Sequence, residues 1–492
     1  MASALSLKDV LSCPAHVLPD ITLTPMDPDV APNYEVPASI LIIGAGVFGL
    51  STALALTKRP EFASTSLTIL DRSPDPGVFP ARDASSIDSS RIIRADYADP
   101  DYAALASEAQ AHWRQTDPTS LGGEGRYTES GFILAADSGP MVREDGSPTG
   151  ISYAKKSWVN ALALAQKEGR SLGSIHMLAT PKTIGLVSRT GGEFADWGYL
   201  NDASGWADAE RSMKWFYEQV AATGRITFVN GTAVNLETDE ETKRVTGARL
   251  KDGSTLSADL VIAAAGAWTP TLVDLSSQAV ATGQVLGYLD LTEEEQQKLE
   301  KIPVMLNIST GLFVIPPRNR ELKVARHGYG YLNPRPVSNP PLGIPTSKPP
   351  PKLVSQPHTH LDDAALSIPR EGEKALREAL RKTIPWPELQ DRPFSRTRLC
   401  WYTDTATGDW IIDYHPYWQG LFIATGGSGH AFKFLPVIGD KVVNCIMGKC
   451  PIEFQDKWKW KIVEDVEKAI VTEDGSRGGR PGLVLEDELR KV

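Results

Sequence analysis

A glycine-rich turn near the start of the chain is the feature that most restricts its fold. From Ser39 the chain reads SILIIGAGVFGLSTALALTKR, a β-branched strand, a turn and a helix, and a second strand follows and ends in Asp71. Gly44 permits the tight turn, Gly46 lets a pyrophosphate approach the backbone, and Gly49 lets the helix lie close to the sheet. The helix N-terminus attracts phosphates, and the acid holds ribose hydroxyls. The spacing predicts a dinucleotide-binding βαβ unit.

Three other interpretations of this segment have to be weighed. Residues 36–57 carry no charge and are long enough to cross a bilayer, but three glycines in nucleotide-turn spacing argue against a membrane helix. A turn that serves packing alone is the second alternative. The third is an NAD-dependent dehydrogenase, because the glycine motif does not by itself separate NAD from FAD.

Composition excludes several classes of protein. The chain has 492 residues, enough for two large domains or three smaller ones, with 41% hydrophobic and 23% charged residues. Its 51 basic and 61 acidic residues give a net charge of −10. These values argue against disordered, fibrous and nucleic-acid-binding proteins.

Cysteine usage and the termini predict a cytoplasmic protein. The four cysteines show no CxxC spacing and are too scattered for a disulfide framework, which favours a reducing compartment: Cys13, Cys400, Cys445 and Cys450. The N-terminus lacks a basic region followed by an apolar stretch, and the C-terminal LRKV is not a peroxisomal signal. We expect no membrane partner.

Strand-like stretches recur far along the chain and predict two interleaved domains in a mixed α/β fold. They cover residues 226–237, 244–268 and 418–429. We expect a nucleotide-binding domain from residues 36–115, 200–275 and 395–462, and a second domain from 116–199 and 276–394. An irregular arm (1–35), a Pro-rich loop (331–357) and a charged tail with one helix (463–492) complete the chain. The Pro-rich loop reads as a stiff connector rather than a PxxP ligand.

Two runs near the C-terminus carry a family resemblance, RLCWYTDTATGDWIIDYHP and LFIATGGSGHAFKFLPVIG. They resemble the closing FAD-binding region of the monomeric sarcosine oxidase and amadoriase (fructosyl amino acid oxidase) family. ASSIDSSRIIRADYADPDY and AAAGAWTP resemble its flavin-side segments. The resemblance implies a Rossmann-like FAD-binding domain with a mixed-sheet substrate domain. It implies FAD contacts at Gly44, Gly46, Val47, Phe48, Gly49, Asp71, Arg72, Ser90, Arg91, Val234, Gly266, Gly427, Gly429, His430 and Lys433.

The resemblance assigns a covalent role to Cys400. The family attaches the flavin 8α-methyl group through a cysteinyl sulfur at this point of the LCWYTD run. A thiolate is the nucleophile that such a bond requires, and the attachment favours amine oxidation. A buried, unreactive cysteine is the alternative.

The same resemblance implies catalytic roles for Lys323, His327 and Tyr402. The family keeps a lysine facing flavin N5, where a cation stabilises the superoxide formed from oxygen. Without the resemblance, Lys323 would read as a solvated surface charge. A histidine at 327 and a tyrosine at 402 match sarcosine oxidase, whereas amadoriases place a glutamate at the first position. The departure argues against fructosyl amino acids and for an N-methylated secondary amine.

A carboxylate-binding pair is implied at Arg94 and Lys433, where a bidentate guanidinium lies beside a point charge. Structural ion pairs are the alternative for both. His358 and His360 lie in a Pro-rich loop without further ligands, so we expect no metal site. The run at 426–430 has a histidine where a hydrolase elbow requires a glycine, so we do not expect a hydrolase.

The expected function is oxidation of a secondary amine to an imine, with O2 reduced to H2O2. The long arm and Pro-rich insertion favour a branch that resembles the fumisoquin-pathway oxidase of fungal alkaloid biosynthesis, in which a phenol captures the imine and closes an isoquinoline ring. Fructosyl amino acid oxidase, saccharopine or pipecolate oxidase, and an FAD dehydrogenase that does not use O2 remain alternatives, as does a non-catalytic flavin-binding protein. We expect a monomer whose partners are the small amine and O2.

Overall fold

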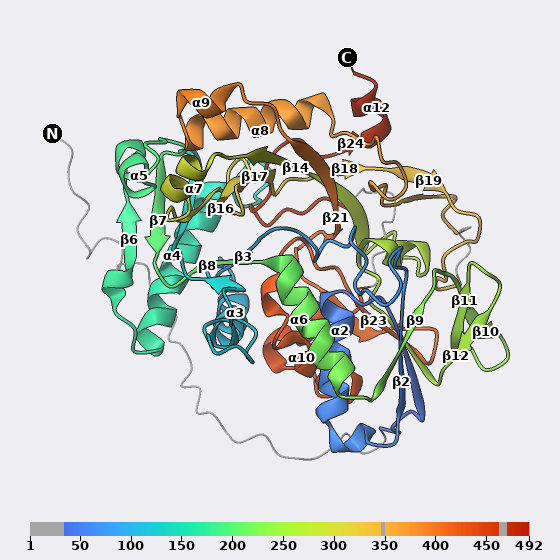
Figure 1. The fold of residues 1–492 in the computed structure, drawn as a ribbon. Helices are drawn as coiled ribbons and strands as arrows, with labels where there is room; N and C mark the ends of the chain where they lie inside the picture. The colour runs from blue at the N-terminus through green and yellow to red at the C-terminus, as the bar shows by residue number, and fades with distance from the viewer. Residues whose placement is uncertain (1–33, 346–349, 462–469, 492) are drawn as a thin grey trace.

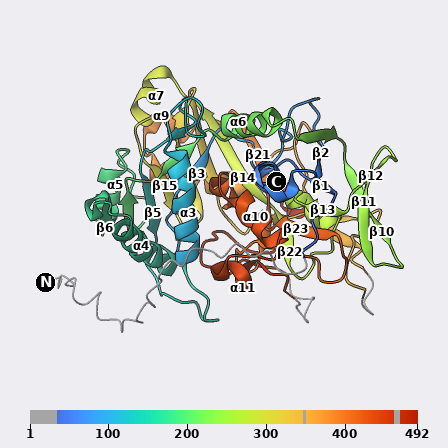
Figure 2. The same ribbon diagram turned by 90° about the horizontal axis from the view of Figure 1, so that it is seen from below.

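Two large β-sheets organise the chain, and segments far apart in the sequence alternate between them (Figures 1 and 2). The computed structural model describes residues 34–345, 350–461 and 470–491. The predicted arm, residues 1–35, lies outside this range except for its last two residues. The mixed α/β fold class is confirmed.

The first sheet contains the predicted nucleotide-binding unit and has the strand order β22-β23-β13-β1-β2-β9. All neighbouring strands are parallel except β22, which runs antiparallel to β23. Its strands are β1 (Ser39–Ile43), β2 (Ser66–Asp71), β9 (Ile226–Asn230), β13 (Leu260–Ala263), β22 (Ile411–Tyr414) and β23 (Leu421–Thr425). Helix α2 (Val47–Lys58) connects β1 to β2 and completes the βαβ unit.

Both faces of this sheet are buried, which explains the continuous apolar run of β1. Ile40 and Ile42 belong to a core shared with α2, α6 (Ala209–Ala222) and α10 (Ile438–Ile446). Leu41 and Ile43 belong to a core shared with a three-stranded sheet on the other face. That sheet comprises β10 (Ala233–Asp239), β11 (Arg244–Leu250) and β12 (Thr255–Ser257).

The second sheet is mixed and has ten strands, in the order β24-β18-β14-β17-β16-β15-β5-β7-β6 with β21 also paired to β14. Pairs β5–β15 and β18–β24 are parallel, and the others are antiparallel. Its strands are β5 (Phe132–Ala136), β6 (Ile175–Leu178), β7 (Trp197–Asn201), β14 (Ala279–Asp290), β15 (Val304–Asn307), β16 (Leu312–Arg318), β17 (Glu321–Arg326), β18 (Tyr331–Leu332), β21 (Arg396–Thr405) and β24 (Leu483–Val484).

One predicted domain assignment differs from the structure. Residues 396–405, which the sequence placed with the nucleotide-binding domain, form β21 and pair with β14 over ten residues, from Ala279–Thr405 to Tyr288–Arg396. The reason is that β21 leads into β22 and β23 of the first sheet, so its sequence neighbours belong to the other domain. Strand β21 therefore carries side chains from the second sheet toward the first.

Helices α8 (Arg370–Thr383) and α4 (Gly150–Lys167) pack on the second sheet. Helix α8 contacts β14, β16 and β17, and α4 contacts β5 and β7. The remaining helices are α3 (Pro100–Trp113), α5 (Pro181–Val187), α7 (Glu293–Leu299), α9 (Pro387–Gln390), α11 (Gln455–Trp458) and α12 (Leu485–Leu489). No helix in the described part of the chain has both the length and the apolar content needed to cross a membrane.

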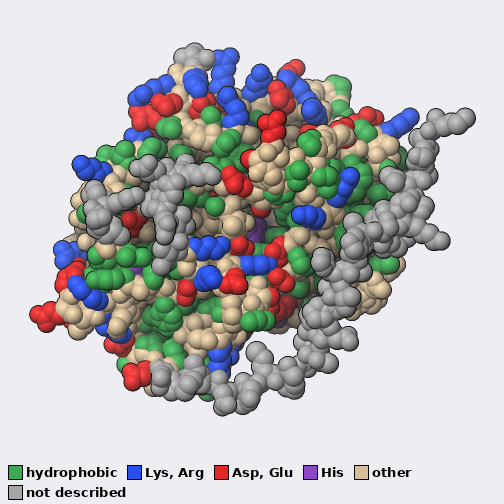
Figure 3. Space-filling view, turned by 180° about the vertical axis from the view of Figure 1, so that it is seen from behind, with side chains coloured by type: hydrophobic (Ala, Val, Ile, Leu, Met, Phe, Trp, Pro, Cys, Tyr) green, Lys and Arg blue, Asp and Glu red, His purple; other side chains and the backbone are tan. Residues whose placement is uncertain are grey.

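Short strands complete the structure. Strands β3 (Arg91–Ile93), β4 (Tyr127–Thr128) and β8 (Gly205–Ala207) form one small sheet, and β19 (Pro334–Pro336) pairs with β20 (Leu353–Ser355) within the predicted Pro-rich loop. On the face shown in Figure 3, basic and acidic side chains are intermixed.

Candidate active site

The glycine turn after β1 has the geometry that the sequence predicted. Gly44 has a φ of 111°, and a Cβ there would lie 2.4 Å from the carbonyl oxygen of Ala264. A Cβ on Gly49 would lie 1.8 Å from the carbonyl oxygen of Gly44. Gly46, by contrast, has nothing within 4 Å of where its Cβ would be. The first two positions therefore require glycine for packing, and Gly46 leaves room for a ligand against the backbone.

The N-terminus of α2 is free to bind phosphate. Gly46 caps the helix without a side-chain hydrogen bond, and the first turn contains no acid. Asp71, at the end of β2, accepts a hydrogen bond of 2.8 Å from the Ala45 N–H, and burial raises the pKa of Asp71 to about 6. One carboxylate oxygen thus orders the turn while the other remains available for a ribose hydroxyl, as a dinucleotide requires.

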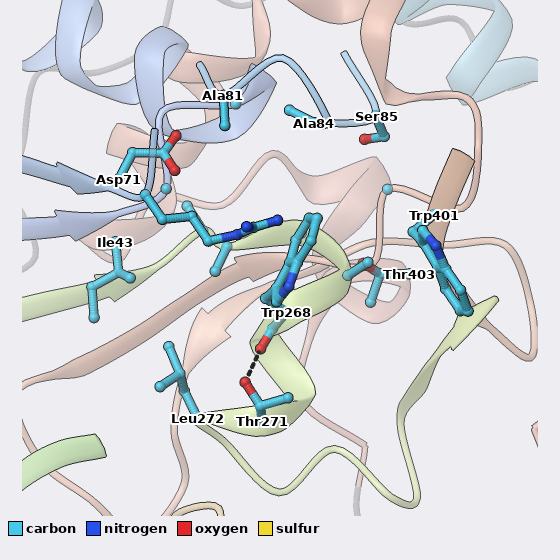
Figure 4. Close-up of a pocket in the computed structure, with 18 of the residues that line it drawn as sticks. Ile43, Asp71, Ala81, Ala84, Ser85, Trp268, Thr271, Leu272, Trp401 and Thr403 are labelled. Atoms are coloured by element: carbon cyan, nitrogen blue, oxygen red, sulfur yellow. Dashed lines mark hydrogen bonds between the residues drawn. The ribbon is translucent and has the colours of Figure 1, made fainter. Parts of the chain in front are cut away.

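A cavity of about 420 Å³ begins at this turn. Figure 4 shows Asp71, Ala81, Ala84 and Ser85 on one side and Trp268 facing Trp401 across it. The guanidinium of Arg72 lies over the Trp268 ring at 4.2 Å, and the Thr271 hydroxyl donates to the Trp268 carbonyl at 2.7 Å. Predicted residues that line this cavity are Gly44, Gly46, Val47, Phe48, Asp71, Arg72, Arg91, Val234, Gly266, Tyr402, Gly427, Gly429 and His430.

A second cavity, of about 80 Å³, adjoins the first. The two cavities share the lining residues Arg91, Tyr402, Gly429, His430 and Phe432. The predicted residues Ser90, Arg94, Lys323, His327, Cys400 and Lys433 line the second cavity and not the first. The structure thus brings the proposed substrate and catalytic residues to one place, beside the dinucleotide cavity. Gly49 lines neither, because it lies against the glycine turn.

Lys323, on β17, is a buried cation at the wall between the domains. Its Nζ donates to Asp88 Oδ2 at 2.6 Å and to the Ser90 carbonyl at 2.8 Å. Burial lowers the pKa of Lys323 to about 8, and the carboxylate of Asp88 opposes this shift. Burial alone would raise the pKa of Asp88, but the charges of Lys323 and Arg91 hold it well below its ordinary value. The pair is therefore ionised at neutral pH.

Cys400 lies midway along β21 and is 2% exposed. Its sulfur accepts a contact of 3.6 Å from Arg91 Nη2, and Arg91 also forms an ion pair with Asp88. Cys400 lines the second cavity, next to Arg91, which lines both cavities.

Arg94 holds an unused hydrogen-bond donor in the second cavity. The side chain is buried, its guanidinium carbon lies 4.7 Å from the centre of the Tyr97 ring, and Nη1 has no hydrogen-bond partner. A buried donor without a partner is costly unless a ligand supplies the acceptor. Because the guanidinium is always charged, that ligand is expected to be an anion.

Lys433, from the short turn after β23, completes the basic end of this cavity. Its Nζ donates to Tyr97 Oη at 2.7 Å and to the His430 carbonyl at 2.8 Å. Tyr97 Oη in turn lies 3.1 Å from His430 Nδ1, and His430 Nε2 lies 2.9 Å from the Gly408 carbonyl. Burial and then the charge of Arg94 lower the pKa of Lys433 well below its usual value. A carboxylate beside the two groups would favour the charged ammonium.

His327 follows β17 and contacts a residue that sequence reasoning missed. Its Nδ1 lies 3.0 Å from Nη1 of Arg477, and its ring centre lies 5.7 Å from that of Tyr402. Burial, followed by the charge of Arg477, holds the pKa of His327 well below its ordinary value, and burial raises that of Tyr402. No local sequence pattern identifies Arg477 as a site residue, and it lies in the predicted C-terminal tail.

Asp88, Tyr97 and Trp268 were also missed, although each lies within a run that carried the resemblance. No group of three or more side chains able to hold a metal ion occurs among the described residues. The backbone carbonyl of His358 accepts a hydrogen bond of 2.8 Å from the indole N–H of Trp401.

Comparisons with known proteins agree with this architecture. The sequence profile of the family described as "FAD dependent oxidoreductase" matches residues 39–444. The amino acid oxidase imqH of Aspergillus flavus is 33% identical over 452 residues, which cover 84% of this chain and 93% of that protein. The amino acid oxidase fsqB of Aspergillus fumigatus is 28% identical over 468 residues, with coverage of 84% and 93%.

A solved structure extends the likeness to three dimensions. The crystal structure of fructosyl amine:oxygen oxidoreductase (amadoriase I) from Aspergillus fumigatus has a TM-score of 0.72 and 26% identity, and covers 94% of this chain and 98% of that one. The likeness includes both sheets, since it spans nearly the whole chain. The chain therefore belongs to the family of FAD-dependent oxidoreductases, and its relatives include amine and amino acid oxidases.

Proposed function

We propose that this protein oxidises a secondary, N-methylated amine that carries a carboxylate, forming an imine and reducing O2 to H2O2. The amine loses two electrons and two protons, and O2 gains them. One observation carries the proposal: the second cavity places the unpartnered Nη1 of Arg94 in the same wall as Lys323 and Cys400, next to the dinucleotide cavity. An anion at Arg94 would hold the rest of the substrate beside the catalytic groups.

The residues of the first cavity fit an FAD. The N-terminus of α2 would hold the pyrophosphate, Asp71 the ribose, and the loop 427–430 the far end of the cofactor. Bound FAD supplies the hydride acceptor for the amine and the electrons for oxygen. We further propose that Cys400 Sγ bonds covalently to the flavin 8α-methyl group, because Cys400 lies in the wall of the second cavity beside Arg91, which lines both cavities. The C–S bond would replace the thiol S–H bond and one C–H bond of the methyl group, and the two electrons released would pass to O2.

The charge of the second cavity supports an anionic substrate. None of its described lining residues is acidic, whereas Arg91, Arg94, Lys323, Arg326 and Lys433 are basic. Lys323 and Arg91 share the single carboxylate of Asp88, and Arg326 is paired with Glu371 at 2.7 Å. Arg94 and Lys433 are left for a carboxylate, and a bidentate guanidinium suits that group.

The apolar lining of the cavity favours a substrate with an aromatic or aliphatic side chain. Leu306, Phe313, Ile315 and Phe432 contribute to its walls. A phenol held there could capture the imine and close an isoquinoline ring, as in the fungal alkaloid branch that the sequence resembles. A fructosyl amino acid is less suited, because His327 stands where amadoriases have a glutamate and the sugar would meet these apolar walls.

Two assays test the proposal. Acid precipitation of the purified protein should leave the yellow colour in the pellet. N-methyl amino acids should release peroxide, and the methyl esters of the same amino acids should do so only at a much higher KM. Reduction of the flavin by these amines without peroxide would indicate a dehydrogenase instead. Demethylated amine and formaldehyde as the only products would exclude ring closure. Peroxide from fructosyl amino acids alone would overturn the substrate class.

A further inference from the structure

We infer that Arg477, in the C-terminal segment, fixes His327 as a neutral imidazole with its proton on Nε2, so that His327 donates a hydrogen bond in the substrate cavity and does not accept the substrate's proton. Arg477 is thus a positioning residue. The inference deepens the proposed function and rests on it only in assigning the second cavity to the substrate.

The contact between Arg477 and His327 determines the tautomer. The guanidinium Nη1 lies 3.0 Å from His327 Nδ1. A guanidinium has only donors, so Nδ1 must be the acceptor and cannot carry a proton. A neutral imidazole has one N–H group, which is then on Nε2.

Arg477 is itself held in place by two further contacts. Its Nη2 donates to Asp404 Oδ1 at 2.6 Å and to the Ser428 carbonyl at 2.9 Å. Asp404, on β21, also accepts a hydrogen bond of 2.5 Å from the Thr282 hydroxyl on β14. The side chains of Arg477 and Asp404 are 1% and 5% exposed. A buried, doubly anchored guanidinium has little freedom to leave His327.

The segment that carries Arg477 is fastened to the site by its backbone. We call residues 470–484 the C-terminal strap. Its Thr472 hydroxyl donates to the Thr405 carbonyl at 2.9 Å, and the Gly478 N–H donates to the His327 carbonyl at 3.2 Å. A Cβ on Gly478 would lie 1.8 Å from the Thr310 carbonyl oxygen. The strap therefore approaches His327 closely enough only with glycine at 478.

The groups around His327 all oppose a second proton on its ring. Burial and the charges of Arg477, Arg94 and Lys433 keep its pKa well below the ordinary value, and His430 and Tyr402 are the other titratable neighbours. His430 cannot act as the base instead. Its Nε2 faces the Gly408 carbonyl and must carry the proton, and its Nδ1 is occupied by Tyr97 Oη at 3.1 Å. His327 and His430 are therefore not available to accept the proton of the substrate amine.

Histidine-selective ¹⁵N labelling tests the inference without substrate. In long-range ¹H–¹⁵N spectra of the holoenzyme, with His327→Gln to assign the signal, we expect His327 Nδ1 to be unprotonated and Nε2 protonated from pH 6 to pH 9. In Arg477→Met we expect mixed tautomers, because Nδ1 no longer faces a group that can only donate, while burial still keeps the pKa of His327 below its ordinary value. Arg480→Met, an exposed arginine of the same strap, is the matched control and should leave the spectrum unchanged.

Kinetics give an independent readout. Arg477→Met should lower kcat about tenfold, the loss expected for one misplaced hydrogen-bond donor. Arg477→Lys, which keeps the cation beside Asp404, should recover part of kcat.

A wild-type His327 with its proton on Nδ1 would overturn the inference, as would an Arg477→Met spectrum identical to the wild type. If Arg477→Met does not fold, the His327 tautomer in the wild-type spectrum and the kcat of Arg477→Lys still test the inference. An enzyme with the expected tautomer that turns over no amine would instead contradict the proposed function.

Discussion

Lys323 Nζ lies 2.6 Å from Asp88 Oδ2, and this buried ion pair lies beside the second cavity. Asp88 also accepts a hydrogen bond of 2.6 Å from the Tyr288 hydroxyl. The carboxylate keeps the ammonium charged and in place, because burial by itself would favour the neutral amine. A fixed cation beside the flavin is the arrangement that stabilises superoxide when oxygen takes its first electron.

Replacing Lys323 by Met should therefore slow reoxidation by O2 by roughly a hundredfold, with a much smaller effect on flavin reduction by the amine. Stopped-flow measurement of the two half-reactions gives both values. The variant removes one of the two cations that pair with Asp88, and Arg91 remains as its partner. Thermal unfolding of the variant separates a loss of stability from the loss of oxygen reactivity. Equal slowing of both half-reactions would refute the role of Lys323.

Replacing Cys400 by Ala should convert covalent flavin to dissociable flavin. Acid precipitation of the variant should release the yellow colour into the supernatant, while the wild type retains it in the pellet. Cys445→Ala is the matched control, because Cys445 is also buried but lies in α10 away from both cavities. Release of flavin from the wild type would show that no bond to Cys400 exists.

Replacing Arg94 by Met should raise KM for a carboxylate-bearing amine about thirtyfold, since one charge-assisted hydrogen bond contributes about 2 kcal/mol. The effect on the ester of the same substrate should be small, because the ester offers no charge. Arg335→Met, at an exposed ion pair with Glu486, is the control. Equal loss for acid and ester would indicate that Arg94 maintains the fold rather than binds substrate.

The two half-reactions should depend on pH in opposite directions. The substrate must be a free amine, so kcat/KM should rise about tenfold per pH unit below the amine pKa of roughly 10. Lys323 has a pKa lowered to about 8, so its charge is present below pH 8 and is lost as the pH rises through that value. Reoxidation should therefore slow above pH 8. Reoxidation that is constant from pH 6 to pH 10 would contradict this assignment.

Local patterns in the sequence were sufficient to predict the glycine turn and the acid that orders it. Gly44, Gly49 and Asp71 follow one another within a single βαβ unit, and the restrictions on the turn are steric and local. The alternation of strands with helices also predicted the fold class, because buried parallel strands are continuous apolar runs. The boundary at β21 was wrong because sequence neighbours there pair with different sheets.

The substrate half of the site depended on contacts between distant residues. Asp88 and Lys323 are 235 positions apart, and His327 and Arg477 are 150 apart. No periodicity links such pairs, since they meet only when β14, β17 and β21 align in one sheet and the C-terminal strap folds back across it.

By itself the sequence determined the glycine turn, its acid and the family, because these depend on spacing within short runs of the chain. Only the tertiary structure decided that Lys323 is ionised beside Asp88, that Arg94 has a free donor, and that Arg477 sets the state of His327. The physical reason is that charge state and hydrogen bonding depend on burial and on partners. Both are properties of packing between elements that lie far apart in the sequence.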